Sequence, residues 1–225
     1  MKINIGPATP DRASHIASLI MEAMNPGCCQ NLAGAHHTLA EFHQVMERLV
    51  RMEDSQYSYR NTLLATNSEG ITAGIIVSYD GAQLKALRKR FIEEAKETFG
   101  IDYTGMDPET QEGELYIDSL AVPAAFRGKG IAKMLLKAVI EKGWEMGLPA
   151  VGLLVDKGNP KAERLYADMG FEYVNDAVWG GHSMKHLQYP LRYFSDFGIR
   201  YSSSSISSSF ISLSSWPRQR YLRVS

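Results

Sequence analysis

The sequence predicts a fold of the mixed α/β (α+β) class, built on one sheet with both parallel and antiparallel strands. Strand-like and amphipathic helical segments alternate through residues 3–192. A strand–helix–strand unit in the middle of the chain makes the strands at 114–122 and 150–155 parallel neighbours, because a crossover helix joins parallel strands. Short connections elsewhere predict antiparallel hairpins. The chain has 225 residues, enough for one domain with a sizeable core.

The N-terminal half is predicted to contain a strand, two helices, a hairpin and a third helix. Thr9-Pro10 places a capping residue and a proline at the start of the first helix. Asn25-Pro26-Gly27 is expected to end it, before a loop at 28–37. Thr38 and Glu41 form a capping box that opens the second helix. The expected elements are a strand at 2–8, helices at 10–24 and 38–52, strands at 61–66 and 71–79, and a helix at 83–99.

The C-terminal half is predicted to contain two strand–helix units followed by two strands. The strand at 114–122 leads through a glycine-rich turn into a helix at 131–146. Asn159 and Pro160 are natural first residues of a later helix, and Gly170 is a natural stop. The remaining expected elements are strands at 151–155, 171–175 and 183–191.

The turn between residues 122 and 132 has the composition of an anion-binding site. Gly128 and Gly130 allow backbone N–H groups to face a ligand, and Arg127 and Lys129 add positive charge. The first N–H groups of the following helix have no partner within the helix and carry the positive end of its dipole. The turn therefore predicts a pyrophosphate site, and the alternative is an ordinary tight turn. It matches neither a Walker loop nor a dinucleotide fingerprint.

A second motif follows about thirty residues later. Taken alone, it reads as a short amphipathic helix in which Tyr166 fills the core. Together the two segments resemble the GNAT superfamily of N-acyltransferases. The matching positions are Arg127, Gly130 and Ala132 in the acyl-CoA loop, and Asn159, Ala162, Leu165, Tyr166, Gly170 and Phe171 in the later motif.

The resemblance implies a fold and a reaction. The fold would be a GNAT-like mixed, mostly antiparallel sheet over residues 1–192, with one central parallel pair and helices on both faces. The reaction would be transfer of an acetyl group from acetyl-CoA, the cosubstrate, to a primary amine in a ternary complex. The alternative is a non-catalytic acyl-CoA-binding or regulatory module on the same fold, which would not need the chemistry of Tyr166.

The resemblance also assigns residues. Backbone groups of the strand would pair with the pantetheine arm, and the turn would hold the pyrophosphate. Tyr166 would be the general acid that protonates the thiolate. Asp118 and Glu114 are candidate bases, because alternate strand positions share one face, and a salt-bridged acid is the alternative for Glu114. The positions implied in cosubstrate binding are Leu120, Ala121, Val122, Arg127, Gly128, Lys129, Gly130, Ile131, Ala132 and Asn159.

Acidic and histidine side chains near the strand at 114–122 indicate the chemical class of the acceptor. The carboxylates that precede or open it are Asp102, Asp107, Glu109, Glu112 and Glu114, which favours a cationic acceptor: a small amine, a peptide N-terminus or a lysine. His36, His37 and His182 lie in loops expected to border the acceptor cleft, although such histidines are more often on the surface.

The amino-acid composition excludes several other classes of ligand and location. A net charge of −1 argues against nucleic acid, and no run of about 18 apolar residues predicts a membrane span. The two adjacent cysteines, Cys28 and Cys29, predict reduced thiols and a cytoplasmic protein, and the alternative is a reactive thiol pair near the active site. No ligand set at metal spacing occurs, so no metal is expected. A homodimer is left open.

The last segment, 193–225, differs from the rest. Ten of the fourteen residues from 202 to 215 are serine, which predicts disorder because little apolar surface is available for burial. The alternatives are a strand that docks through its few apolar residues, or a read-through tail without function.

Overall fold

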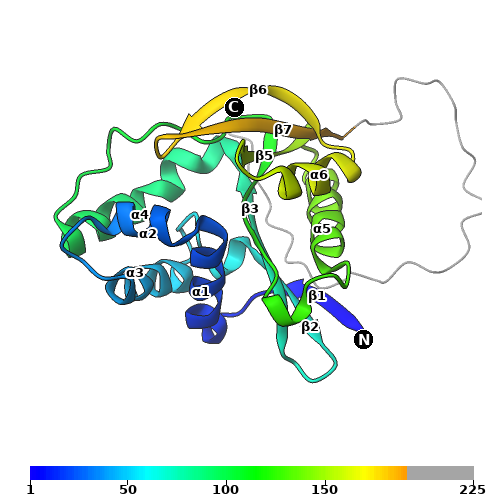
Figure 1. The fold of residues 1–225 in the computed structure, drawn as a ribbon, viewed down its shortest axis with the longest axis horizontal. Helices are drawn as coiled ribbons and strands as arrows, with labels where there is room; N and C mark the ends of the chain where they lie inside the picture. Colours follow the sequence, from blue (N-terminus) through cyan, green and yellow to red (C-terminus); the bar gives the residue numbers. More distant parts are fainter. Residues whose placement is uncertain (192–225) are drawn as a thin grey trace, which may run out of the picture. The chain divides into compact units, whose positions relative to one another are not determined.

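A seven-stranded sheet organises residues 1–191, the part of the chain that the structure, a computed structural model, describes. Its strand order is β1-β2-β3-β4-β5-β7-β6 (Figure 1). The serine-rich segment predicted to be disordered lies outside the described residues. The strands are β1 (Ile3–Pro7), β2 (Thr62–Asn67), β3 (Thr72–Asp80), β4 (Glu114–Ala121), β5 (Ala150–Asp156), β6 (Glu172–Trp179) and β7 (His182–Pro190).

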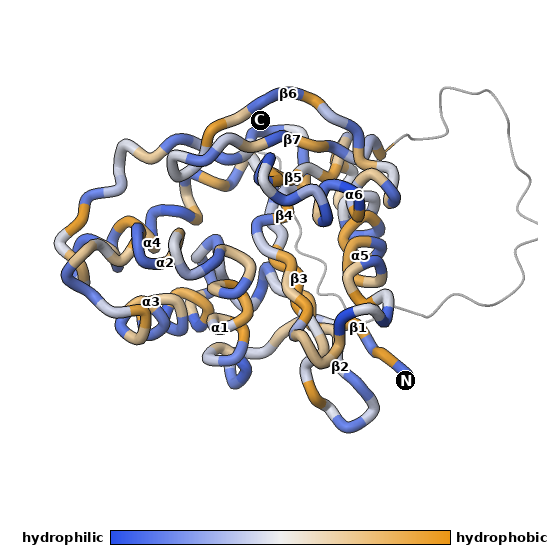
Figure 2. Tube along the Cα trace, in the orientation of Figure 1, coloured by the Kyte–Doolittle hydropathy of each residue, from blue (hydrophilic) through white to orange (hydrophobic). Residues whose placement is uncertain are grey.

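Helices cover both faces of this sheet, as expected. Figure 1 shows α1 to α4 on one side and α5 and α6 on the other. The helices are α1 (Ala13–Met24), α2 (Pro26–Ala33), α3 (Leu39–Arg51), α4 (Leu84–Phe99), α5 (Ile131–Glu145) and α6 (Pro160–Asp168). The hydrophobic colour runs along β3 in Figure 2, where all residues except the last are buried. None of the helices in residues 1–191 is long and apolar enough to cross a bilayer.

One parallel pair stands among antiparallel neighbours, which confirms the predicted fold class. Residues 114–117 of β4 pair with residues 150–153 of β5. Beyond these residues β4 continues along β3 while β5 continues along β7, so the two parallel strands separate. The separation leaves backbone groups of both strands without a partner in the ladder between them.

A buried carboxylate lies inside the paired part of these strands. Glu114 is fully buried and accepts hydrogen bonds from Thr110 Oγ1 at 2.6 Å and Gln188 Nε2 at 2.8 Å. His186 Nε2 lies 2.8 Å from the same carboxylate. Burial opposes the charge, but the hydrogen bonds from His186, Thr110 and Gln188 outweigh it and hold the pKa of Glu114 below its ordinary value. Gly152 on β5 leaves room for this side chain, since a Cβ there would overlap Oε2 of Glu114.

The predicted loop at 28–37 is wrong over its first half, where the structure has α2. Asn25 adopts a left-handed φ of 70°, which ends α1. Its side chain then accepts a hydrogen bond from Cys28 N at 2.9 Å, so the same residue caps the next helix, with Pro26 in its first turn. A stop signal and a start signal therefore coincide. The capping box of Thr38 and Glu41 is present at the start of α3, as predicted.

Candidate active site

A cavity of about 620 Å³ lies where β4 and β5 separate. Its walls come from both strands, from the α1–α2 junction, from α6 and from the β6–β7 hairpin. The lining residues are Glu22, Ala23, Met24, Asn25, Cys28, Tyr57, Glu109, Tyr116, Asp118, Ser119, Leu120, Leu154, Val155, Asp156, Gly158, Asn159, Ala162, Tyr166, Trp179, His182 and Met184. The sheet thus opens a site at the point where its parallel strands stop pairing.

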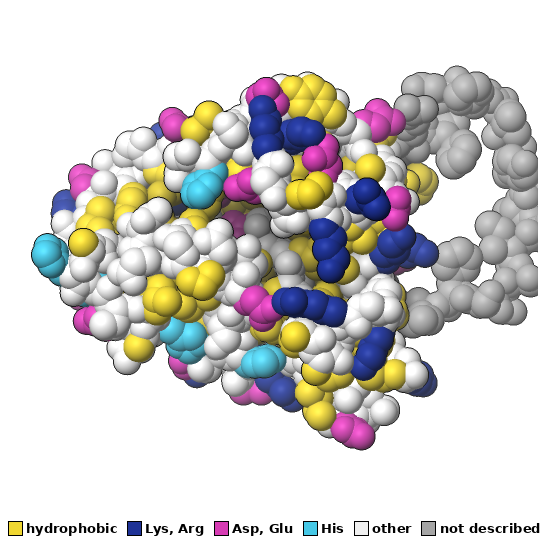
Figure 3. All heavy atoms as spheres, viewed as in Figure 1, with side chains coloured by type: hydrophobic (Ala, Val, Ile, Leu, Met, Phe, Trp, Pro, Cys, Tyr) yellow, Lys and Arg dark blue, Asp and Glu magenta, His cyan; other side chains and the backbone are white. Residues whose placement is uncertain are grey.

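The turn between β4 and α5 has the backbone of an anion site. Gly128 and Gly130 both have a φ of 75°, a conformation that other residues rarely adopt. Gly130 is the N-cap of α5 and provides no side chain to cap the first N–H groups of that helix. Figure 3 shows basic side chains in dark blue over the region of α5 and α6. This surface is suited to a phosphate-bearing ligand.

The two basic side chains of the turn are themselves engaged. Arg127 donates from Nε to Val122 O at 3.0 Å and forms an ion pair with Glu22 at 2.5 Å. Lys129 donates from Nζ to Ala125 O at 3.0 Å. Of the positions expected to bind the cosubstrate, Leu120 and Asn159 line the cavity. The turn and the start of α5 do not line it; they follow β4 directly.

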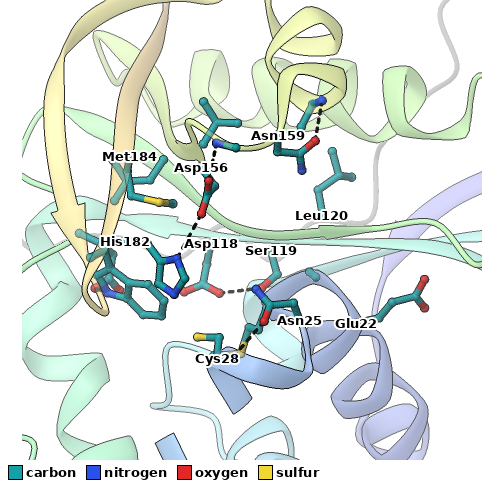
Figure 4. A pocket seen from close by; sticks show the side chains of 18 of the residues that line it. Glu22, Asn25, Cys28, Asp118, Ser119, Leu120, Asp156, Asn159, His182 and Met184 are labelled. Atoms are coloured by element: carbon teal, nitrogen blue, oxygen red, sulfur yellow. Dashed lines mark hydrogen bonds and ion pairs between the residues drawn. The ribbon is translucent and has the colours of Figure 1, made fainter. Parts of the chain in front are cut away.

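Asn159 and Tyr166 enter the cavity from α6. Asn159 Oδ1 accepts a hydrogen bond from Ala162 N at 3.1 Å, so this residue both caps the helix and lines the cavity (Figure 4). Tyr166 is half-buried and packs edge-on against Phe171, with ring centroids 5.8 Å apart. Burial raises the pKa of Tyr166 to about 12, so the phenol keeps its proton at neutral pH.

Asp118 lines the same cavity from β4. In Figure 4 it lies between Asn25 and Cys28 of the α1–α2 junction and His182 and Met184 of the hairpin. Ser119 Oγ donates to Asp118 Oδ1 at 2.8 Å. Burial raises the pKa of Asp118 above its ordinary value, although hydrogen bonds and a nearby arginine partly offset the effect. A carboxylate with a raised pKa is a better base than an exposed one.

The two candidate bases are therefore in different environments. Glu114 does not line the cavity, and three donors surround its carboxylate within the sheet. Asp118, four residues later, lies where the strands have separated.

The other acidic and histidine residues expected near the acceptor also fall into two groups, those that line the cavity and those that do not. Of the five acids near the strand, Glu109 lines the cavity, whereas Asp102, Asp107, Glu112 and Glu114 do not. Of the three histidines, His182 lines it and lies 3.4 Å from Asp156, while His36 and His37 do not line it. Among residues 1–191 no cluster of three or more His, Cys, Asp or Glu side chains is placed to hold a metal ion.

Sequence reasoning missed a buried hydrogen-bond network around Glu109 in the wall of the cavity. Glu109 is 6% exposed and forms an ion pair with Arg88 of α4. Trp179 Nε1, from the end of β6, donates to Glu109 Oε2 at 3.1 Å. Tyr79 on β3 and Gln56, before β2, complete the network. No local motif marks these residues, because they come from separate segments of the chain.

Separated parallel strands, a left-handed glycine turn that opens a helix, and a cavity lined by a phenol and a carboxylate occur together in residues 1–191, an arrangement suited to an acyl-CoA ligand. Residues 85–171 match the model of the Acetyltransferase (GNAT) family. Over this segment the chain is similar to the GNAT family of acetyltransferases, and its described part has the GNAT fold.

Similar proteins agree with this assignment. The chain is 40% identical over 70 residues to the acetyltransferase Atu2258 of Agrobacterium fabrum, a match that covers 31% of this chain and 50% of that protein. It is 36% identical over 69 residues to the uncharacterized N-acetyltransferase YdgE of Bacillus subtilis, covering 31% and 44%. The matches thus span about half the length of these curated relatives. A crystal structure described as an acetyltransferase superposes with a TM-score of 0.70 at 27% identity, covering 84% of this chain and all of that one.

Proposed function

We propose that this protein is an N-acetyltransferase that moves the acetyl group of acetyl-CoA directly to a primary amine in a ternary complex. One observation carries the proposal: Asp118 and Tyr166 line the same cavity, at the point where β4 and β5 separate. A base for the amine and an acid for the departing thiolate are the two proton-handling groups that this reaction needs.

The donor would bind across the end of β4 and the start of α5. Backbone groups of Leu120, Ala121 and Val122, which have no partner on β5, would pair with the pantetheine arm. The N–H groups from Arg127 to Ala132 would hold the pyrophosphate, since both glycines of this turn leave them uncovered. Asn159 would contact the donor from α6.

Asp118 would accept the proton of the acceptor amine, directly or through a water molecule. The free amine would then attack the thioester carbonyl carbon, and the carbon–sulfur bond would break as the new amide forms. The nitrogen would lose its second proton in this step, and the departing thiolate would take up a proton and leave as CoA thiol. Tyr166 would donate a hydrogen bond that shortens as negative charge develops on the sulfur. Glu114 is not part of this proposal, because it lies outside the cavity with its oxygens occupied.

The different-class alternative is a module that binds acyl-CoA without turning it over. Such a module would need the turn before α5 but neither Asp118 nor Tyr166. Their presence in one cavity favours the enzyme. Buried, unlinked Cys28 and Cys29 favour a reducing compartment, and we place the activity in the cytoplasm. Peptide N-termini, lysines and small amines all fit the acceptor class, and a second copy of the chain is a candidate partner.

The test is release of CoA thiol from acetyl-CoA in the presence of a panel of amines, amino-sugars and peptides. Turnover with any acceptor, abolished in a Tyr166→Phe, Asp118→Asn double variant that still binds CoA, is the expected result. CoA binding without turnover of any acceptor would favour the binding module.

A further inference from the structure

We propose that Glu109 acts with Asp118 as a pair of carboxylates that selects acceptor amines lacking a carboxylate on the carbon that bears the amine. Free α-amino acids are then poor acceptors, and the corresponding decarboxylated amines are good ones. This inference rests on the proposed function, since it concerns the acceptor end of the same cavity. It adds a specificity residue that the catalytic strand does not contain.

The two carboxylates share their hydrogen-bond donors. The Tyr79 hydroxyl lies 3.0 Å from Glu109 Oε1 and 3.4 Å from Asp118 Oδ2. Gln56 Nε2 lies 3.3 Å from each of the same two oxygens. Both carboxylates line the cavity. One hydroxyl and one amide nitrogen therefore hold the two acids side by side.

One positive charge faces these two negative ones. Arg88 is buried, forms an ion pair with Glu109, and donates to the backbone oxygens of Met106 and Asp107 at 3.1 and 2.9 Å. These bonds fix the segment that carries Glu109. With both acids ionised, the group retains one uncompensated negative charge, which an ammonium group can neutralise.

The hydrogen-bonding groups at this end also favour a donor. The Gln56 side chain is 2% exposed, and its Oε1 has no hydrogen-bond donor among the described residues. Gln56 Nε2 already serves both carboxylates. Arg88 Nε also has no hydrogen bond there, and Nη2 has only its ion pair with Glu109, so the buried network by itself contains both unpaired acceptors and unpaired donors. The acceptor oxygens that reach the cavity are those of Glu109 and Asp118, and a protonated amine supplies donors to them.

The rest of the lining repels a second carboxylate. Glu22, Glu109, Asp118 and Asp156 line the cavity, and its lining includes no lysine or arginine. Glu22 is paired with Arg127, and Asp156 with His182, at the other parts of the wall. An α-carboxylate on the acceptor would face Asp118 and Glu109, while Arg88, the buried cation beside them, does not line the cavity. The site therefore discriminates by repulsion as well as by attraction.

Aromatic side chains complete the acceptor end. Tyr57, Tyr116 and Trp179 line the cavity, and Trp179 also donates to Glu109. These faces suit an aliphatic or aromatic chain next to an ammonium group. The groups that face Asp118 from the surrounding elements are Gln56, Tyr57, Tyr79, Arg88, Glu109, Tyr116, Ser119 and His182.

The experiment compares two pairs of amines that differ only in the α-carboxylate: 2-phenylethylamine with phenylalanine, and 1,4-diaminobutane with ornithine. Binding to the full chain is measured by calorimetry in the presence of CoA, and turnover is measured separately with acetyl-CoA. We expect the wild-type protein to bind the decarboxylated member of at least one pair about tenfold or more tightly than its partner. Equal affinity within each pair, preference for the amino acid, or no binding of any of the four would overturn the inference.

Glu109→Gln tests the residue itself. The neutral amide no longer compensates the positive charge of Arg88. We therefore expect the preference for the decarboxylated amine to fall about tenfold or to reverse in favour of the amino acid. The KM of the acceptor should rise while the KM of acetyl-CoA stays the same. Glu112→Gln, an exposed position in the same segment, should leave both values at their wild-type level. An unchanged preference in folded Glu109→Gln would contradict the role.

These outcomes separate the inference from the proposed function. Turnover of all four amines without preference would leave the acetyltransferase standing and remove the selectivity. Selective binding without turnover of any amine would support the selectivity and contradict the acetyltransferase activity. A purely structural role of Glu109 would lower stability without changing the ratio of affinities within a pair. If the Glu109→Gln protein does not fold, because a buried cation has lost its partner, the wild-type comparison still decides.

Discussion

The turn before α5 is exposed and held by local backbone contacts and one exposed ion pair to Glu22, whereas the Glu109–Asp118 network is buried and joins distant segments. Arg127 and Lys129 bond to backbone oxygens five and four residues away. Gln56 reaches Asp118 across 62 residues, and Trp179 reaches Glu109 across 70. Changes on the donor side should therefore affect ligand binding with little loss of stability, while changes on the acceptor side should affect specificity and stability together.

The largest expected effect comes from Tyr166, on the donor-side helix α6. Tyr166→Phe keeps the ring and its contact with Phe171 but removes the hydroxyl. We expect kcat to fall by about 10²–10⁴, the range for a lost acid catalyst, with CoA affinity nearly unchanged. Tyr189→Phe is the matched control, because Tyr189 also packs on Phe171 but does not line the cavity. Wild-type kcat in the Tyr166 variant would reduce this tyrosine to a packing residue.

The next effect concerns Asp118 on the acceptor side. A base acts only when ionised, so the wild-type rate should rise with pH through the pKa of Asp118, which burial places above its ordinary value. Asp118→Asn should lose this acidic limb and lower kcat/KM by about 10² at neutral pH, with a smaller difference at low pH. Full pH–rate profiles of both proteins measure this.

Glu114→Gln provides the contrast on the same strand. Gln would present its amide nitrogen either to the Thr110 hydroxyl or to the Gln188 and His186 donors, because these bond different oxygens of Glu114, so we expect a lower melting temperature. The acidic limb of the pH–rate profile should remain. If the limb disappears in this variant and persists in Asp118→Asn, the base has been assigned to the wrong residue.

A smaller effect tests the turn. Gly130 has a positive φ, and a Cβ there would meet nothing within 4 Å, so Ala and Asp share the same backbone strain of about 1–2 kcal/mol. Asp adds a negative charge where the pyrophosphate would sit. We expect Gly130→Asp to bind CoA at least about tenfold more weakly than Gly130→Ala in calorimetry, with similar stability of the two proteins. Equal affinities would show that no phosphate contacts the turn.

The smallest effect concerns Lys142 on α5, away from the cavity. Its Nζ donates to Ser78 O at 3.0 Å, and burial lowers its pKa from 10.5 to about 8. Between these two values the unfolded chain binds a proton that the folded chain does not, so stability should rise with pH. Lys142→Met should remove this rise, which we expect to be about 2 kcal/mol between pH 7 and 9.5 in urea unfolding. Parallel stabilities of the two proteins across this range would contradict it.

Local signals predicted most of the fold and the donor side of the site. Three of these signals act through neighbouring residues: the capping box of α3, the proline at the start of α6 and the glycines before α5. Because all the interacting residues lie close together in the chain, a short stretch of sequence is enough to predict them. α2 was missed because Asn25 both ends one helix and caps the next.

The acceptor side could not be predicted in the same way. Glu109 stood among several acids in a polar segment, and its burial depends on Arg88 and Trp179, which lie 21 residues before it and 70 residues after it. The alternation of β4 placed Glu114 and Asp118 on one face but contained no information on where β5 leaves the strand pair.

The space that Gly152 leaves for Glu114 has an evolutionary consequence. Gly152 is in register with Tyr116, two residues beyond Glu114, and the Glu114 side chain reaches over it. A side chain at 152 would therefore expel the carboxylate, and a shorter residue at 114 would leave a void. Neither position is free to drift without the other. If a small residue replaces Glu114 during evolution, a larger residue can be accommodated at position 152. Such paired substitutions would mark sequences in which this part of the sheet is packed differently while its two parallel strands still separate.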